Sequence, residues 1–233
     1  MRTLALGDIH GCFAALTALE NLVDWDDDLL VTLGDYTDRG PRSREVLDWL
    51  IERDRTGRLI ALRGNHDLMM LAARDDETAL GFWLAYGGRD TLRSYAPAGQ
   101  DGTIADVPEE HWRFLAERTR PYYESDAHLF VHASLESELP LEQQSEHALY
   151  WKKIDGPDGP PPPHRSGKPI VCGHTSQSSG QPLLFAGGVC IDTRVYGDGW
   201  LTCLDVATGH YWQANERGQT RQGELAGWSR SAL

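Results

Sequence analysis

The chain has 233 residues, 40% of them hydrophobic and 24% charged, which is the composition of a folded globular protein and excludes a largely disordered or fibrous one. The 35 acidic and 22 basic side chains give a formal net charge of −13, and this excess argues against a nucleic-acid polymer as a partner. No apolar run approaches the roughly 18 residues of a membrane-spanning helix, and the apolar segment at 3–6 is too short for a secretory leader. We therefore expect a cytoplasmic protein that does not bind a membrane.

Four cysteines lie in or near apolar segments: Cys12, Cys172, Cys190 and Cys203. They show no Cys-X-X-Cys spacing, so we expect buried, reduced thiols and neither a disulfide framework nor a structural zinc site. The sequence leaves the oligomeric state open.

The N-terminal part of the chain repeats a short apolar run, a turn rich in Gly and Asp, and an amphipathic segment. The apolar runs at 3–6, 29–33 and 59–62 are predicted strands about thirty residues apart, which is the length of a βαβ unit. Parallel strands follow from this spacing. Apolar positions within 16–23 and 46–51 predict helices that cover the sheet.

Residues 68–96 and 108–118 are predicted to be mainly helical, and we expect about 68–120 to form a helical insert or cap. Strands are predicted at 129–131, 170–172, 189–191, 201–204 and 211–213, with the last two as a hairpin, so that the second half adds a more antiparallel sheet. Five prolines within 156–163 predict an extended loop and no domain boundary. One domain is expected over 1–214, followed by a mobile tail at 215–233.

Side chains of the kind that bind metal ions follow five of the predicted strands. In chain order they are Asp8, His10, Asp35, Asn65, His132 and His174. Because open α/β sheets assemble their sites at the carboxyl ends of strands, we expect these side chains to converge. The set combines nitrogen and oxygen ligands without thiolate, which suits manganese, iron or zinc better than calcium or magnesium. It is large enough for two ions.

Each of these residues also has a less specific explanation. An Asp-X-His in a loop is usually solvated surface, and Gly34-Asp35 or Gly64-Asn65 alone fits an ordinary turn. Turn preference does not explain why such groups recur after five apolar segments in two regions of the chain. The repetition therefore favours a metal site.

Five motifs occur in a fixed order: Gly7-Asp8-Ile9-His10-Gly11, Gly34-Asp35-Tyr36-Thr37-Asp38-Arg39-Gly40, Gly64-Asn65-His66-Asp67, Val131-His132 and Gly173-His174-Thr175. Together they resemble the phosphoprotein phosphatase family, a branch of the calcineurin-like metallophosphoesterases. The short bacterial and bacteriophage members, such as the lambda phosphatase, are the most similar, and the resemblance covers about residues 3–206. It implies an α/β fold in which a two-sheet β-sandwich is flanked by helices, an αββα arrangement.

The resemblance also implies two metal sites that share one carboxylate. One ion would be held by Asp8, His10 and Asp35, and the other by Asp35, Asn65, His132 and His174. The expected cofactor is a pair of divalent ions, with manganese first and iron or zinc as alternatives. By the same resemblance, His66 is the general acid, Asp38 the residue that orients it, and Arg39 a ligand of the substrate phosphate.

The chemistry of phosphate ester hydrolysis is consistent with these residue types. Two divalent ions about 3.5–4 Å apart can share a water, lower its pKa and bind phosphoryl oxygens. A histidine that is not a ligand can protonate the leaving oxygen near neutral pH, and a carboxylate bonded to the imidazole keeps it charged and oriented. The planar guanidinium of an arginine matches two phosphate oxygens.

Two positions depart from the pattern of the similar phosphatases. Asp67 stands where they usually have Glu, as in the wider superfamily. The Trp-X-Arg segment of the bacteriophage enzyme, whose arginine resembles a second phosphate ligand, corresponds here to Trp151-Lys152-Lys153. Lys153 is therefore a candidate substrate-binding residue, although it offers a point charge and no bidentate fork. Arg165 is the alternative source of a guanidinium.

The leading prediction is a dimetal phosphomonoesterase that resembles bacterial serine/threonine protein phosphatases. Its substrate would be a phosphorylated protein or peptide, or a small phosphoester. The alternative is a symmetrical diadenosine tetraphosphate hydrolase, which shares all five motifs. A hypothesis of another class is a binding module that keeps the fold without catalysis, although no member of the predicted site is missing from the sequence.

Overall fold

The computed structural model describes residues 1–228, and the chain begins with consecutive βαβ units. β1 (Thr3–Leu6), β2 (Leu29–Thr32) and β3 (Leu59–Ala61) are parallel neighbours. α1 (Phe13–Leu22) and α2 (Ser43–Arg55) connect them. The predicted parallel arrangement is confirmed. Each connection contains a helix and is long enough to bring the chain back to the end of the sheet at which the previous strand began.

The first sheet has six strands in the order β11-β10-β9-β1-β2-β3. Its antiparallel half consists of β9 (Leu201–Asp205), β10 (His210–Ala214) and β11 (Thr220–Glu224), and β9 and β10 form the predicted hairpin. β11 corrects the tail expected at 215–233. It is a polar edge strand without a buried face, so its sequence lacks the apolar alternation that marks other strands. Residues 229–233 of that expected tail lie outside the described residues.

The second sheet has five strands in the order β4-β5-β6-β8-β7. They are β4 (Tyr122–Glu124), β5 (Leu129–Val131), β6 (Ile170–Cys172), β7 (Leu183–Phe185) and β8 (Gly188–Cys190). β5, β6 and β8 are parallel, and only β4 and β7 pair antiparallel to their neighbours. The expected antiparallel character is therefore wrong for the centre of this sheet, because strand direction depends on how the connections cross and not on the strand sequences.

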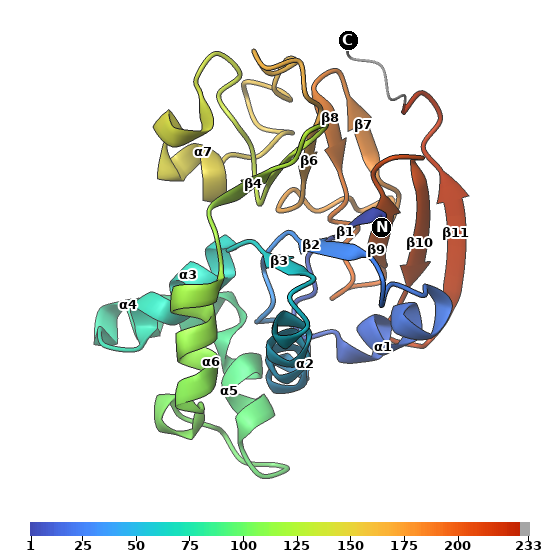
Figure 1. The fold of residues 1–233 in the computed structure, drawn as a ribbon. Coiled ribbons are helices and arrows are strands. Elements are labelled where there is room, and N and C mark those ends of the chain that lie inside the picture. The colour runs from blue at the N-terminus through green and yellow to red at the C-terminus, as the bar shows by residue number, and fades with distance from the viewer. Residues whose placement is uncertain (229–233) are drawn as a thin grey trace.

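The two sheets pack face to face, and helices cover their outer faces (Figure 1). In β1, Leu4 belongs to the apolar cluster that contains α1 and α2, whereas Ala5 belongs to the cluster between the sheets together with Phe130 of β5. In β5, Leu129 packs in a third cluster with Leu149 of α7 (Glu146–Tyr150). The strands are thus buried on both faces, which explains their continuous apolar runs, and the αββα order is confirmed.

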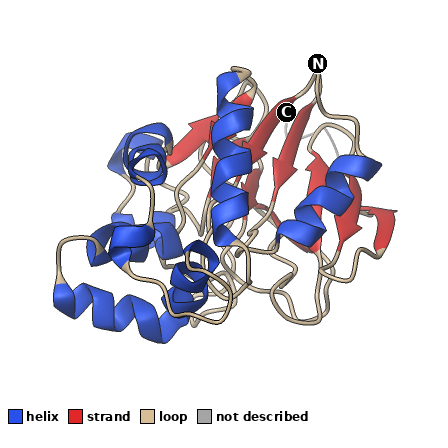
Figure 2. Ribbon diagram, turned by 90° about the horizontal axis from the view of Figure 1, so that it is seen from below, coloured by secondary structure: helices blue, strands red, loops and turns tan. Residues whose placement is uncertain are grey.

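Most of the other helices form one group between β3 and β4. They are α3 (Asn65–Ala73), α4 (Glu77–Trp83), η1 (Leu84–Gly88), α5 (Arg89–Tyr95), η2 (Ile104–Asp106), α6 (Glu109–Arg113) and η3 (Phe114–Arg118). α5 and α6 contact α2. In the view from below, most of the helices lie beside the strands, to the left of and below them (Figure 2).

Two remaining segments complete the described chain. η4 (Leu141–Gln143) is a short turn before α7, and the proline-rich segment at 156–163 contains neither helix nor strand, as predicted. Within residues 1–228, no helix combines the length and apolar character needed to cross a membrane.

Candidate dimetal active site

The loops at the carboxyl ends of the strands carry backbone conformations that side chains rarely adopt. Six non-glycine residues in the described part of the chain have a positive φ, and five of them belong to the predicted site: His10, Asp35, Asp38, Arg39 and His174. A left-handed backbone costs roughly 1–3 kcal/mol at such a residue and persists only where the surrounding structure holds it. This concentration of strain marks the loops after β1, β2 and β6 as a functional site.

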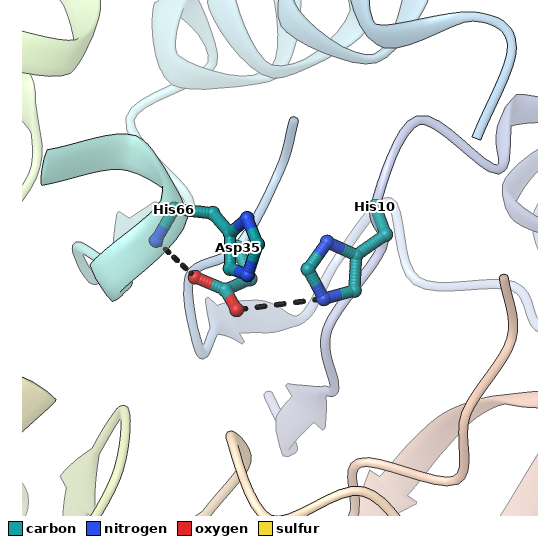
Figure 3. A group of neighbouring side chains, drawn as sticks. All are labelled: His10, Asp35 and His66. Carbon is teal, nitrogen blue, oxygen red and sulfur yellow. Dashed lines mark hydrogen bonds and ion pairs between the residues drawn. The ribbon is translucent and has the colours of Figure 1, made fainter. Parts of the chain in front are cut away.

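The carboxylate of Asp35 lies between two groups of histidines. Its Oδ2 is 3.4 Å from His10 Nε2, and its Oδ1 is 3.5 Å from His132 Nε2. Figure 3 shows the Asp35 carboxylate pointing toward His10, with its second oxygen accepting a hydrogen bond from the backbone N–H of His66. Two groups of candidate metal ligands therefore share Asp35, one with His10 and His66 and one with His132 and His174.

Backbone carbonyls orient two of the histidine rings toward this carboxylate. His10 Nδ1 donates to the carbonyl of Thr37 at 2.8 Å, and His132 Nδ1 donates to the carbonyl of Leu33 at 2.9 Å. Because Nδ1 carries the proton in each ring, the Nε2 lone pair is directed into the site. This arrangement is typical of histidines that bind a metal ion.

Asn65 joins the second ligand group through its amide oxygen. Its Oδ1 lies 3.0 Å from His132 Nε2 and 2.9 Å from His174 Nδ1. Burial and the neighbouring His132 lower the pKa of His174 to about 3, so the ring is neutral and able to act as a ligand at physiological pH. The four predicted members of this group are brought together.

Asp8 provides a direct test of whether a metal fits the first group. Its Oδ2 accepts a hydrogen bond from the backbone N–H of His174 at 3.0 Å, but its Oδ1 is buried without a protein partner. Burial, with Asp192 and Asp35 close by, raises the pKa of Asp8 well above its ordinary value. An orphaned buried oxygen among several carboxylates is stabilised by a cation, so the donor set fits divalent metal ions.

Asp67, noted in the sequence only as a departure, supports the loop that carries Asp35. Its carboxylate accepts hydrogen bonds from three backbone N–H groups, those of Asp35, Tyr36 and Gly64. Burial and the charge of Asp35 raise its pKa to about 7. At Gly64 the backbone passes so close to Asp35 that a Cβ atom would collide with the carboxylate, which explains the glycine.

His66 uses one of its ring nitrogens, Nδ1, to bond a carboxylate outside the two ligand groups. Its Nδ1 donates to Asp38 Oδ2 at 2.6 Å, and the two side chains are almost fully buried. Burial would lower the pKa of His66, but Asp35 and the hydrogen bond to Asp38 raise it above its ordinary value. The pair has the geometry of a proton donor and its orienting carboxylate.

Two residues that sequence reasoning missed hold Asp38 in place. Trp83 Nε1 lies 2.9 and 3.0 Å from the two Asp38 carboxylate oxygens, and the Thr91 hydroxyl donates to Oδ1 at 2.7 Å. The Asp38 backbone N–H donates to Thr91 Oγ1 at 2.8 Å. The helical region around α4 and α5 is thus part of the site, and no spacing in the sequence connects these residues to Asp38.

The Arg39 guanidinium lies between the rings of His10 and His66. It donates to His10 Nε2 at 2.6 Å and to His66 Nε2 at 2.8 Å, and it lies 4.4 Å above the centre of the Tyr196 ring. Tyr196 was not among the predicted site residues. The guanidinium is therefore held at the mouth of the ligand groups by an aromatic face.

A cavity of about 350 Å³ lies over the site, and its lining shows which of the two alternative phosphate ligands, Lys153 or Arg165, reaches the site. Lys153 lines it, together with Arg39, His66 and His174. Arg165 does not line it: its backbone N–H donates to the carbonyl of Ser137, and its guanidinium points to the carbonyl of Glu138. The structure thus brings Lys153 to the site and leaves Arg165 outside.

A two-sheet αββα core with two ligand groups joined by one carboxylate defines a metallophosphoesterase. The chain belongs to the calcineurin-like phosphoesterase family, whose model matches residues 1–189. This family uses a dinuclear metal centre, in agreement with the histidine and aspartate groups around Asp35.

Curated relatives carry two kinds of name. The symmetrical bis(5'-nucleosyl)-tetraphosphatase of Methylobacillus flagellatus is 35% identical over 158 residues, which cover 64% of this chain and 51% of that protein. A protein of the same name from Stutzerimonas stutzeri is 30% identical over 151 residues. Serine/threonine-protein phosphatase 1 of Salmonella typhimurium is 45% identical over 85 residues, which cover 36% of this chain and 37% of that protein. The chain spans about half the length of the tetraphosphatases it matches.

Solved structures support the same fold. A crystal structure provisionally described as a diadenosine tetraphosphatase aligns over 96% of this chain and 93% of that chain with a TM-score of 0.64 and 20% identity. A protein serine/threonine phosphatase from Saccharomyces cerevisiae aligns over 97% of this chain and 80% of that chain with a TM-score of 0.56 and 14% identity. At these identities the likeness concerns the fold.

Proposed function

We propose that this calcineurin-like phosphoesterase hydrolyses dinucleoside polyphosphates, with cleavage of diadenosine tetraphosphate into two molecules of ADP as its reaction. The observation that carries the hydrolytic chemistry is the pair of ligand groups joined by Asp35 beside the His66–Asp38 pair. The substrate is suggested by the two relatives named symmetrical bis(5'-nucleosyl)-tetraphosphatase. It replaces a phosphorylated protein as the first candidate substrate.

The ligand groups supply a place for each of two divalent ions. Asp8, His10 and Asp35 would hold one ion, with the unpartnered Oδ1 of Asp8 as a ligand, and Asp35, Asn65, His132 and His174 would hold the other. When bound there, two such ions lower the pKa of a water and neutralise the charge on the phosphoryl oxygens. Manganese, iron and zinc all suit the nitrogen and oxygen donors, and manganese is our first choice.

His66 supplies the proton that leaves with the product. Water attacks one central phosphorus atom, the central P–O bond breaks, and the departing ADP oxygen takes a proton from His66 Nε2. Asp38 accepts from the opposite ring nitrogen, so it fixes the ring orientation and favours the charged imidazolium. In the present arrangement His66 Nε2 accepts a hydrogen bond from the Arg39 guanidinium and carries no proton. We infer that Arg39 moves to the substrate phosphate when substrate binds, and that Nε2 then takes up from water the proton that it gives to the leaving oxygen.

Two cations bind the phosphate chain. The Arg39 guanidinium can contact two phosphoryl oxygens at once, and the Tyr196 ring supports its flat face. Lys153 adds a point charge in the same cavity. A tetraphosphate carries more negative charge than a single phosphoester, so it makes use of both cations.

Protein serine/threonine phosphatase activity is the second candidate. A specific observation favours it: the 45% identity over 85 residues to serine/threonine-protein phosphatase 1 of Salmonella typhimurium. The same residues would act on a phosphoserine, because attack at phosphorus and protonation of the leaving oxygen are common to both reactions. The two candidates therefore differ in substrate recognition and not in chemistry.

A direct comparison of products separates them. We expect the manganese-loaded protein to release ADP from diadenosine tetraphosphate with a higher kcat/KM than it releases phosphate from a phosphoserine peptide. The His66→Asn variant serves as the control for contaminating activity. Efficient phosphate release without ADP formation would replace the proposed reaction by the second candidate. A protein inert toward both, and toward p-nitrophenyl phosphate, would be a binding module.

A further inference from the structure

Large hydrophobic side chains that are exposed to solvent gather at the active-site cavity. Among the described residues six such side chains are exposed, and three of them line this cavity: Phe82, Tyr86 and Trp151. Phe82 and Tyr86 are each 52% exposed, and Trp151 is 39% exposed. Half-exposed aromatic rings beside charged side chains are a common feature of sites that bind molecules with flat, apolar groups.

Phe82 and Tyr86 form one aromatic pair, which we call the α4 platform. They lie four positions apart across the end of α4, with ring centroids 4.6 Å apart and planes inclined by 37°. Gly87 follows immediately with a φ of 118°, and a Cβ atom there would lie 2.9 Å from the Arg39 backbone nitrogen. The platform is therefore anchored directly against the loop that carries the phosphate-binding arginine.

Trp151 reaches the same cavity from another part of the fold. It follows α7, which Figure 1 shows apart from α4. Its carbonyl oxygen lies 3.2 Å from His174 Nε2, which ties the backbone of this residue to the second ligand group. Lys153, two positions later, lines the cavity as well. Each aromatic surface is thus paired with a nearby cation.

We propose that the α4 platform and Trp151 bind the two nucleobases of a dinucleoside polyphosphate by stacking. The inference rests on the proposed function and names the residues that select its substrate. In this binding mode the phosphate chain contacts Arg39 and Lys153, and a base extends from each end to one aromatic surface. All of these residues line the same cavity. A base has a flat π face that stacks on an aromatic side chain without specific hydrogen bonds. An inorganic polyphosphate lacks this group and gains nothing from the rings.

Binding of two probes to the manganese-loaded protein tests the inference without turnover. One probe is diadenosine tetraphosphate with a methylene group in place of the central bridging oxygen, and the other is inorganic tetrapolyphosphate. Stacking on aromatic side chains predicts that Phe82→Ala with Tyr86→Ala raises the Kd of the dinucleotide roughly 10- to 100-fold. Trp151→Ala is expected to act similarly. The Kd of tetrapolyphosphate changes less than about threefold, because the cations that hold it are unchanged.

Two control variants separate stacking from general damage. Leu183 is an exposed hydrophobic residue of β7 that does not line the cavity, so Leu183→Ala leaves both Kd values unchanged. Phe82→Tyr with Tyr86→Phe keeps two rings in place and is expected to restore dinucleotide binding. Parallel weakening of both probes by the alanine variants, or no change in either, overturns the inference.

The outcome is distinguishable from a failure of the proposed function. If the aromatic residues control binding of the dinucleotide but the wild-type protein forms no ADP from the cleavable substrate, the proposed reaction is wrong and the stacking sites stand. If the dinucleotide binds no better than tetrapolyphosphate, while the alanine variants raise KM for a phosphopeptide, the rings recognise peptide side chains and the nucleobase inference is overturned.

Discussion

Replacement of His66 by asparagine tests the division of labour within the site. His66 directly follows the predicted ligand Asn65, yet the hydrogen bonds of its side chain are to Asp38 and Arg39. Asparagine removes the proton donor without removing a predicted metal ligand. We therefore expect the variant to keep the metal content of the wild type and to lose turnover.

The size of the loss follows from the role of the proton. General acid catalysis by a positioned side chain contributes about 10²- to 10⁴-fold, or roughly 3–5 kcal/mol of transition-state stabilisation. In the variant, Asp38 keeps its hydrogen bonds from Trp83 and Thr91, so its buried carboxylate is not left without donors. The folded state thus loses two hydrogen bonds, the one from His66 to Asp38 and the one from Arg39 to His66, and a bond of this kind to a charged group is worth about 1.5–3 kcal/mol.

The assay compares two leaving groups on the same variant. Phenyl phosphate releases a basic phenolate that needs a proton, whereas the nitro group of p-nitrophenyl phosphate stabilises its leaving oxygen. The fall in kcat is expected to be larger for phenyl phosphate. Metal content is measured in parallel by elemental analysis, and unfolding by urea.

His111→Asn is a matched control. His111 is a buried histidine paired with the carboxylate of Asp48 at 2.9 Å, outside the cavity, so its replacement also removes a buried imidazole–carboxylate hydrogen bond but leaves the site intact. It is expected to affect stability and not the ratio of the two activities. An equal fall for both leaving groups in His66→Asn, or a fall that follows lost metal, would refute the assignment of His66 as the acid.

Three further predictions concern the backbone, the metal ions and the thiols. Gly87→Ala is expected to lower the free energy of unfolding by about 1–3 kcal/mol, because a φ of 118° is strained for alanine. Gly81→Ala has open space at its Cβ and is expected to raise the free energy of unfolding by about 0.5–1 kcal/mol. Urea titrations compare the two variants, and equal effects would contradict the strain at Gly87. Asp35→Asn loses both bound manganese ions and Asp8→Asn only one, as counted by elemental analysis, and two ions retained in Asp35→Asn would exclude a bridging role. All four cysteines are buried and burial raises the pKa of the Cys203 thiol, so a thiol reagent at pH 8 modifies them only after unfolding; rapid labelling of the folded protein would show the core to be open.

Much of the first sheet could be predicted because its inner strands are buried on both faces. Such strands require continuous apolar runs, and the runs at 3–6, 29–33 and 59–62 stand out for that reason. β11 could not be found in this way, since it is an edge strand with one exposed and one half-buried face, and polar residues or glycine occupy both faces. The parallel centre of the second sheet was not predicted, because the sequence of a three-residue strand does not indicate whether it runs parallel or antiparallel to its neighbours.

The ligand residues were predictable because each directly follows a strand whose carboxyl end faces the same edge. Their mutual arrangement was not: that Asp35 directs one oxygen to His10 and the other to His132 depends on the left-handed backbone after β2. Likewise, only the packed structure brought Lys153 to the cavity and kept Arg165 away, since the intervening loop has no periodic pattern to align.

The amino-acid sequence alone indicated the chemical character of this site, because nitrogen and oxygen ligands follow successive predicted strands and the carboxyl ends of parallel strands in one sheet meet at the same edge. That the ligands after β5 and β6 join those after β1, β2 and β3 depends on the packing of the two sheets. The tertiary structure decided what surrounds those ligands. Trp83 and Thr91 reach Asp38 from 45 and 53 positions away, and Tyr196 meets Arg39 from the far end of the chain. Contacts at such separations are set by how helices and sheets pack, which local patterns in the sequence do not encode.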